Sequence, residues 1–286
     1  MFNKSCIPLT LVAFSGFLAQ AGVITIDNFN TGAVYLRGPV GGTPTPFTAC
    51  WYQNVSSNNS ACGSQNFGGA AVNMPSGDDA MSGKDTILNT RYTQLTTTQL
   101  SSGASAGSAK MNINGDVAGA FNLSTDAQTI ANAYLKWDGG VLNTATVGFG
   151  LTLDMLTASN NDSFLLKYQT DNAGLFPPTT TVLISVYTSA TNYSTFSFVV
   201  PATGFPVGVY SNFYAQFNKF VAAGSGGGVN WSNVKAITMN VNTAPGSAAG
   251  LDFILDSFEV VVVPEPSTYL FVAAGLAGLL GFRRKQ

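Results

Sequence analysis

The chain has 286 residues, of which only 9% are charged, and its formal net charge at pH 7 is −2. It contains no histidine, which excludes Ser-His-Asp triads, Cys-His dyads and histidine-based metal centres. The body carries no basic cluster, so nucleic-acid binding is excluded too, because phosphates are bound by clustered Lys and Arg.

The first 21 residues predict a cleavable export signal. A short basic segment ending at Lys4 precedes an apolar run over residues 7–18, and Ala19-Gln20-Ala21 is a small-x-small cleavage site. We therefore expect export through the Sec pathway and a mature chain that begins at Gly22.

Removal of this signal takes away Cys6 and leaves Cys50 and Cys62 as an even pair. An exported protein enters an oxidising compartment, so we expect a disulfide between Cys50 and Cys62. The bridge would close a loop of about a dozen residues and stabilise the fold by roughly 3 kcal/mol.

Trp51 and Tyr52 are the candidate carbohydrate contacts. They are consecutive in a polar stretch, and neighbouring side chains of a strand point to opposite faces, so both rings cannot enter one core. An exposed ring there could stack on a pyranose. Trp137, at the end of an alternating stretch, and Trp231, just before another, are expected to pack in the core instead.

Residues 22–263 predict an all-β fold, a single jelly-roll-like β-sandwich. Runs of β-branched and aromatic residues alternate with period two and are cut by Gly, Asn, Asp and Pro. Only residues 126–132 and 213–221 favour helical turns. The last run alternates imperfectly, so we expect it inside a sheet. The clearest strand candidates are residues 23–29, 110–114, 133–137, 146–156, 163–168, 181–187, 194–200, 234–241 and 251–262.

Calcium is the one cofactor that the sequence suggests. First and last strands lie side by side in jelly-roll modules, and an ion bound by carboxylate and carbonyl oxygens can join them. Asp27 and Asp256 occupy the matching positions. The alternative is that both aspartates are solvated or cap turns.

Enzymatic residues are not expected. A glycosidase needs two carboxylates on either side of a sugar, and Glu259 is the single glutamate of the body. An aspartate-only hydrolase is left as the least favoured alternative, and no particular aspartate stands out.

The last 23 residues, 264–286, combine three features. Pro264-Glu265-Pro266 breaks the preceding strand, because proline lacks an N–H and disfavours the α conformation in the residue before it. An apolar helix is predicted over residues 269–282, and at 1.5 Å per residue it would span about 21 Å, short of a bilayer core of roughly 30 Å. Arg283-Arg284-Lys285 would stay on the cytoplasmic side. The segment predicts a transient membrane anchor with the body on the far side.

This segment resembles the PEP-CTERM protein-sorting signal of Gram-negative bacteria. The resemblance implies recognition of Pro264-Glu265-Pro266 by exosortase, a membrane-embedded cysteine protease. It also implies transient insertion in the inner membrane, removal of the tail and delivery to the cell surface or an exopolysaccharide matrix. The body in turn resembles the jelly-roll ectodomains of other PEP-CTERM proteins and, more distantly, carbohydrate-binding modules.

The sequence is compatible with three functions. The first is a non-enzymatic surface or extracellular-matrix protein, processed by exosortase and associated with exopolysaccharide. The second is a carbohydrate-binding module with a discrete sugar site at Trp51 and Tyr52. The third is the aspartate-dependent glycoside hydrolase.

Overall fold

The computed structural model describes the greater part of the body of the protein. The described residues are 23–30, 34–37, 47–54, 60–61, 90–99, 109–114, 116–126, 129–139, 145–156, 162–171, 180–200, 209–242 and 250–263. The expected signal peptide, residues 1–21, and the expected sorting segment, residues 264–286, lie outside them.

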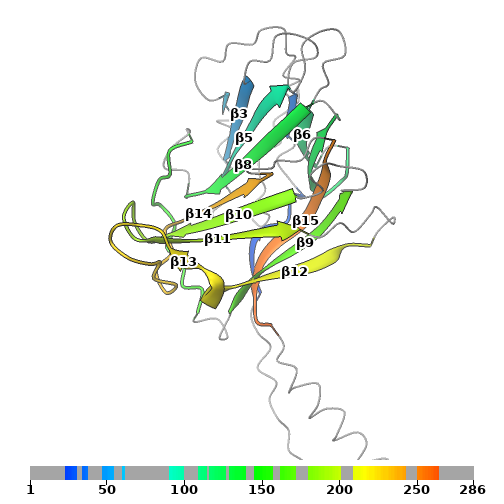
Figure 1. The fold of residues 1–286 in the computed structure, drawn as a ribbon. Helices are drawn as coiled ribbons and strands as arrows, with labels where there is room; N and C mark the ends of the chain where they lie inside the picture. The colour runs from blue at the N-terminus through cyan, green and yellow to red at the C-terminus, as the bar shows by residue number, and fades with distance from the viewer. Residues whose placement is uncertain are drawn as a thin grey trace, which may run out of the picture.

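Two antiparallel sheets form the molecule, which confirms the expected all-β sandwich (Figure 1). In spatial order, the larger sheet consists of β13 (Val221–Ala222), β11 (Tyr193–Val200), β10 (Thr180–Tyr187), β14 (Ala236–Val241), β8 (Thr129–Trp137), β5 (Thr90–Gln99), β3 (Phe47–Asn54) and β4 (Ser60–Ala61). The other sheet consists of β12 (Ser211–Gln216), β9 (Ser163–Asp171), β15 (Asp252–Val261), β7 (Phe121–Thr125), β6 (Ala109–Ile113) and β2 (Val34–Arg37), and β1 (Ile24–Asp27) also pairs with β15.

The core lies between the two sheets. Alternate residues of both sheets are buried, as in β8, where the inward positions end at the fully buried Trp137. That burial confirms the expectation that Trp137 packs in the core. Aromatic rings link the layers: Trp137 contacts Phe258 of β15 at 5.4 Å between ring centroids, and Phe258 stacks on Phe164 of β9 at 5.1 Å.

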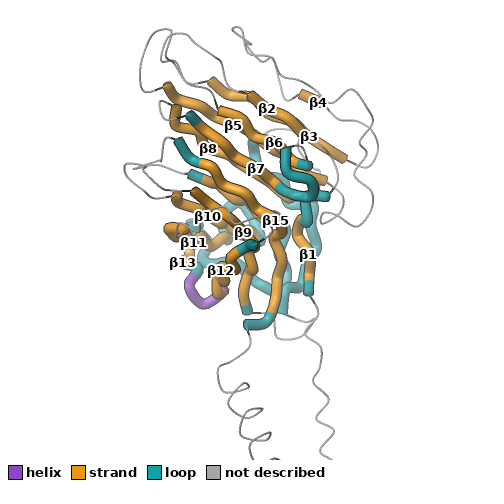
Figure 2. The backbone as a smooth tube through the Cα atoms, turned by 90° about the vertical axis from the view of Figure 1, so that its right-hand side faces the viewer, coloured by secondary structure: helices purple, strands orange, loops and turns teal. Residues whose placement is uncertain are grey.

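The last strand lies inside its sheet, as its imperfect alternation predicted. β15 pairs with β9 along one edge, and β7 and β1 share the other edge (Figure 2). A β-bulge shifts the register between Leu255 and Ser257. Because the bulge inserts one residue, Leu255 before it and Phe258 after it both face the core, which explains why no strict period-two pattern fits this strand.

The expected strand over residues 146–156 is wrong. This segment lies across the outer face of the larger sheet and makes only one isolated bridge, from Leu153 to Val234. The N–H of Gly150 donates to the carbonyl of Asp138, and a Cβ on Gly139 would lie 2.7 Å from the Gly150 backbone. Alternation in the sequence indicated a chain with one buried side. Its hydrogen-bond partners over residues 150–155 are the backbone groups of residues 138 and 231–235, which do not continue a strand here.

The two expected helical turns fare differently. Residues 129–132 of the first belong to β8, so helix is wrong there. Its small residue Ala131 faces the core, a position set by the sheet partners and not by local propensity. The second is correct only at its centre, where a 3₁₀ turn, η2 (Phe217–Lys219), follows β12.

A buried ion pair lies beneath residues 146–148. Lys136 Nζ is 2.6 Å from Asp138 Oδ2, and neither side chain is more than 3% exposed. The same ammonium donates to the Thr146 carbonyl at 2.9 Å, and the Gly148 N–H donates to Asp138 Oδ2 at 2.8 Å. The segment therefore closes over the pair and satisfies its remaining hydrogen bonds, which is the condition under which a buried pair is tolerated.

A second buried ion pair connects the two sheets. Asp27, at the end of β1, accepts hydrogen bonds from Arg91 Nη1 of β5 at 2.9 and 2.7 Å and from Trp137 Nε1 of β8 at 2.9 Å. The Phe29 N–H also donates to Asp27 Oδ1, at 2.9 Å. Phe29 has φ 56°, which is unusual for a bulky residue, and its ring lies 5.6 Å below the Arg91 guanidinium.

The Asp27–Arg91 pair predicts a large effect on stability. Asp27→Asn leaves the Arg91 cation buried without its counter-charge, so the free energy of unfolding in urea should fall by about 3–5 kcal/mol. Asp116→Asn is the matched control, because its pair with Lys110 is 40–44% exposed and should contribute less than about 1 kcal/mol. Equal losses in the two variants would contradict the role assigned to Asp27.

The expected disulfide falls partly outside the described residues. Cys62 lies outside them, and of Cys50 only the backbone in β3 is described. The β3–β4 register pairs Trp51 with Ala61, the neighbours of the two cysteines in sequence. The bridge stays a prediction.

Removing that bridge should destabilise the exported protein. Cys50→Ser is expected to lower the free energy of unfolding by roughly 3 kcal/mol through loss of the closed loop. Thiol labelling of the unfolded, unreduced protein checks the premise: two reactive thiols in the mature chain would rule the bridge out. Reduced wild-type protein serves as the control and should have the same melting temperature as the Cys50→Ser variant.

Candidate functional site

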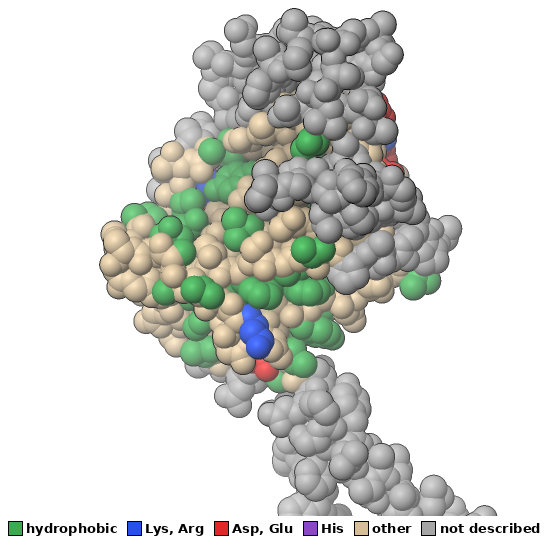
Figure 3. Space-filling model, viewed as in Figure 1, with side chains coloured by type: hydrophobic (Ala, Val, Ile, Leu, Met, Phe, Trp, Pro, Cys, Tyr) green, Lys and Arg blue, Asp and Glu red, His purple; other side chains and the backbone are tan. Residues whose placement is uncertain are grey.

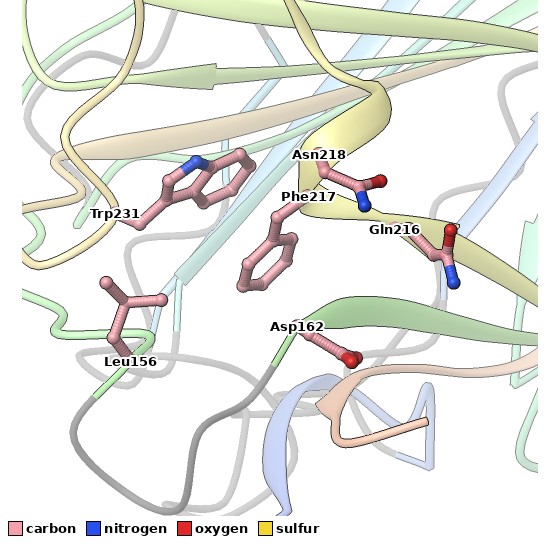
Figure 4. A pocket seen from close by; sticks show the side chains of 6 residues that line it. All are labelled: Leu156, Asp162, Gln216, Phe217, Asn218 and Trp231. Atoms are coloured by element: carbon pink, nitrogen blue, oxygen red, sulfur yellow. The ribbon is translucent and has the colours of Figure 1, made fainter. Parts of the chain in front are cut away.

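One pocket combines an aromatic wall with polar side chains. It lies where β12 turns into η2 and has a volume of about 210 Å³ (Figure 4). Such a volume is below the roughly 300–1,000 Å³ of sites for drug-sized ligands, so it suits a single small ring. The lining residues are Leu156, Asp162, Gln216, Phe217, Asn218 and Trp231.

Backbone pairing fixes the pocket floor. β12 pairs with β9 as far as Gln216 opposite Ser163. The Phe217 N–H then donates to the Asp162 carbonyl at 2.7 Å, and the Phe220 N–H closes the 3₁₀ turn on the Phe217 carbonyl at 3.2 Å. The turn therefore presents Phe217 and Asn218 from the end of a sheet and not from a free loop.

The apolar wall is a stacked pair of rings. Phe217 and Trp231 lie with centroids 4.0 Å apart and planes 8° from parallel, and Phe220 meets the indole edge-on at 5.3 Å. Phe217 is buried and Trp231 is half-buried against the core cluster. The expectation that Trp231 packs is thus confirmed, and in addition its ring lines the pocket. Leu156, 42% exposed, extends the wall.

The polar side chains lie beyond Phe217. Figure 4 shows Trp231 and Leu156 on one side of the Phe217 ring and Asp162, Gln216 and Asn218 on the other. Asp162 Oδ1 accepts hydrogen bonds from Ser163 Oγ at 2.8 Å and from the N–H of residue 263 at 3.0 Å. Within the described part of the chain, the amides of Gln216 and Asn218 form no side-chain hydrogen bond.

The described lining of this pocket offers groups that can bind a ligand. Asp162 is the one carboxylate among the described residues that line the pocket, whereas glycoside hydrolysis uses two on opposite sides of the scissile bond. Two free amides and one carboxylate oxygen offer both donors and acceptors. No pattern in the sequence predicts this site, because its parts come from three separate segments.

The structure does not bring Trp51 and Tyr52 to this pocket. Both belong to β3, next to the β4 edge of the larger sheet, where Tyr52 lies opposite Tyr92 of β5 in register. The structure describes only the backbone of Trp51 and Tyr52. A sugar contact at Trp51 and Tyr52 stays a prediction.

Asp27 is already engaged by other groups, and the calcium site stays a prediction. β1 and β15 do lie side by side, as expected, but both Asp27 oxygens already accept two hydrogen bonds each, and Arg91 occupies the position of a cation. Asp256 lies at the β-bulge, where its charged neighbours are Lys167 and Glu259. In the portion of the chain that is described, no group of three or more His, Cys, Asp or Glu could hold a metal.

The fold ends where the expected sorting segment begins. β15 ends at Val261, and the chain is held for two more residues because the Asp162 N–H donates to the Val261 carbonyl at 3.1 Å and the Val263 N–H donates to Asp162. Pro264-Glu265-Pro266 and Arg283-Arg284-Lys285 lie outside the described residues. Among the helices that are described, none has the length and apolar character to cross a bilayer.

Comparison with known proteins identifies the C-terminal segment. Residues 262–285 match the model of the PEP-CTERM protein-sorting motif, so the chain carries this motif, as its resemblance predicted. The motif implies secretion, transient membrane anchoring and processing by exosortase. No curated protein matches the chain.

Two solved structures share a distant likeness with the body. One is the carbohydrate-binding module CtCBM11, at 7% identity and a TM-score of 0.32, with 60% of this chain and 85% of that one covered. The other comprises the CBM22-1 and GH10 modules of Clostridium thermocellum xylanase 10B complexed with xylohexaose. Its identity with this chain is 12% and its TM-score is 0.26, and the match covers 85% of this chain and 28% of that one. Likeness at this level carries no argument about function.

Asp256 predicts a pH-dependent effect. Burial raises its pKa, Lys167 lowers it and Glu259 raises it, with a net rise above 3.8. A raised carboxyl pKa means that folding favours the protonated form, so this contribution to stability is present at low pH and is lost as pH rises through the folded pKa. The stability of Asp256→Asn relative to wild type should therefore increase between about pH 4 and pH 7.

Melting temperatures across this range check the Asp256 effect. Asn212→Ala on β12 is the control and should give a profile parallel to wild type, because it changes no titratable group. If the melting temperature of wild type rises relative to that of Asp256→Asn as the pH increases, the fold favours the Asp256 carboxylate. The upward direction given for the pKa of Asp256 would then be wrong.

Proposed function

We propose that the protein is a non-enzymatic component of the bacterial surface or extracellular matrix that exosortase processes and that associates with exopolysaccharide. The observation that carries this proposal is the junction between body and sorting motif. The motif match starts at residue 262, directly after the end of β15 at Val261. Nothing separates the folded body from the signal that directs it.

The junction favours cleavage without unfolding. β15 is bordered by three strands, and Asp162 holds the chain as far as Val263. A protease acting at Pro264-Glu265-Pro266 would therefore cut just outside the last residue that the sandwich holds. The released body would keep all the described strands.

The absence of histidine from the sequence, and the presence of one carboxylate among the described residues of the pocket, support a binding or structural role over catalysis. Asp27 and Asp138 are engaged in buried ion pairs, which further reduces the aspartates available to a hydrolase. An aspartate-dependent hydrolase is accordingly not favoured by any feature of the described site.

The surface suits a neutral, hydroxyl-rich environment. Among the described residues of the face in Figure 3, hydrophobic side chains and uncharged surface predominate and few charged side chains are seen, in keeping with the 9% charged residues of the whole chain. Low charge gives little long-range attraction to charged polymers. Hydrogen bonding to polysaccharide hydroxyls is the remaining mode of association, and this supports an exopolysaccharide partner.

Processing predicts a defined mass. Protein recovered from the surface and medium of its host should begin at Gly22 and end near Pro264, because signal peptidase and exosortase remove the two ends. Intact-mass spectrometry measures this directly. A surface form that retains Arg283-Arg284-Lys285 would contradict the proposal.

Alanine at both Pro264 and Pro266 tests the motif itself. This double variant should stay in the membrane fraction with its tail, whereas Asn212→Ala, on β12 of the body, should be processed as wild type. Normal processing of the proline variant would assign cleavage to another protease.

A further inference from the structure

We infer that the pocket lined by Phe217, Trp231 and Asp162 binds one neutral hexopyranose unit of a polysaccharide. The inference rests on the proposed function, which places the protein among exopolysaccharides, and it assigns the contact to a site away from Trp51 and Tyr52. Three properties of the pocket carry it: a fixed aromatic wall, uncommitted polar groups and a single negative charge.

The aromatic wall is held in place before any ligand arrives. Phe217 covers one face of the Trp231 indole and Phe220 packs against its edge. The Met155 N–H donates to the Trp231 carbonyl at 2.9 Å, which fixes the backbone at this residue. A pyranose has a face of C–H bonds that packs on an apolar ring, and a rigid ring loses little conformational entropy on binding.

The polar groups lie on the side of Phe217 away from Trp231, and the hydroxyl rim of the sugar would meet them there. A pyranose carries hydroxyls that both donate and accept, and the Gln216 and Asn218 amides offer both functions while making no side-chain hydrogen bond among the described residues. The Asp162 carboxylate accepts two hydrogen bonds on Oδ1, so Oδ2 is the acceptor for a hydroxyl. Apolar pockets with a few placed polar groups are the usual form of small-molecule sites.

Charge and size define the ligand class. Among the described lining residues, Asp162 is the charged one, so a uronic acid or a sulfated sugar would bring like charges together. A volume of about 210 Å³ admits one ring, not an oligosaccharide. A single sugar ring offers few contacts, so we expect a Kd on the order of 1 mM. Useful retention then requires many protein copies along one polymer.

Saturation-transfer NMR on the processed protein from its host tests the site. The probes are the methyl glycosides of glucose, galactose, mannose and N-acetylglucosamine, with glucuronic acid as the charged comparison. We expect saturable binding of at least one neutral glycoside. The double substitution Gln216→Ala with Asn218→Ala should weaken it about tenfold or more, because both amides are exposed or half-exposed and neither supports the core.

Matched variants separate loss of the site from loss of the fold. Asn212→Ala and Tyr214→Ala change an amide and an aromatic ring on the same strand but outside the pocket lining, and both should bind as wild type. Trp231→Phe should keep the melting temperature within a few degrees and lose the change in tryptophan fluorescence that ligand produces. Unchanged affinity in the amide double variant overturns the inference.

Two other outcomes also overturn it. One is the absence of saturable binding for all four neutral glycosides at 50 mM, roughly fifty times the expected Kd. The other is preferential binding of glucuronic acid. Either result leaves the proposed function standing if the protein is cleaved near Pro264 and recovered from the surface, whereas a tail-bearing protein confined to the membrane defeats the proposed function whatever the sugar result.

Discussion

The carboxylate of Asp27 is the interaction on which the sandwich depends most. It accepts four hydrogen bonds, and its donors come from β5, from β8 and from the turn that follows β1, so one buried group fixes both sheets relative to each other. The same contacts hold Phe29 at a positive φ, with its ring packed below Arg91. The desolvation penalty of a buried ion pair can exceed the Coulombic energy that the pair gains. The geometry of the Asp27–Arg91 pair nevertheless permits only one arrangement of the two sheets.

From this group a continuous set of aromatic contacts leads to the pocket. Trp137, which donates to Asp27, packs on Phe258; Phe258 stacks on Phe164, and Phe164 meets Phe217 at 5.2 Å. Phe217 in turn stacks on the pocket indole. The wall of the pocket is therefore the end of the hydrophobic core, not a group of side chains on a loop. Rigidity at the site follows from the packing that makes the fold stable.

The sequence predicted what depends on local pattern and composition. Fold class, the inner position of β15 and the burial of Trp137 follow from alternation, and the sorting motif follows from a contiguous run of residues. Properties that depend on distant partners were not predictable. Residues 146–156 alternate like a strand but cover a sheet face, and Asp27 resembled a metal ligand until Arg91, 64 positions away in sequence, was seen to occupy its oxygens. The pocket was missed for the same reason.

Asp162 joins the two functional features of the molecule. Its side chain lines the pocket and its Oδ1 accepts from Val263, the last residue before Pro264-Glu265-Pro266, so the pocket lies at the end of the sandwich from which the sorting segment departs. While the proposed anchor is intact, that end would face the membrane, where polysaccharide chains have the least access. Cleavage would remove the anchor and leave the Val263 contact in place, because Val263 belongs to the body. On the proposed function, the sugar site would thus become accessible at the step that releases the protein into the matrix.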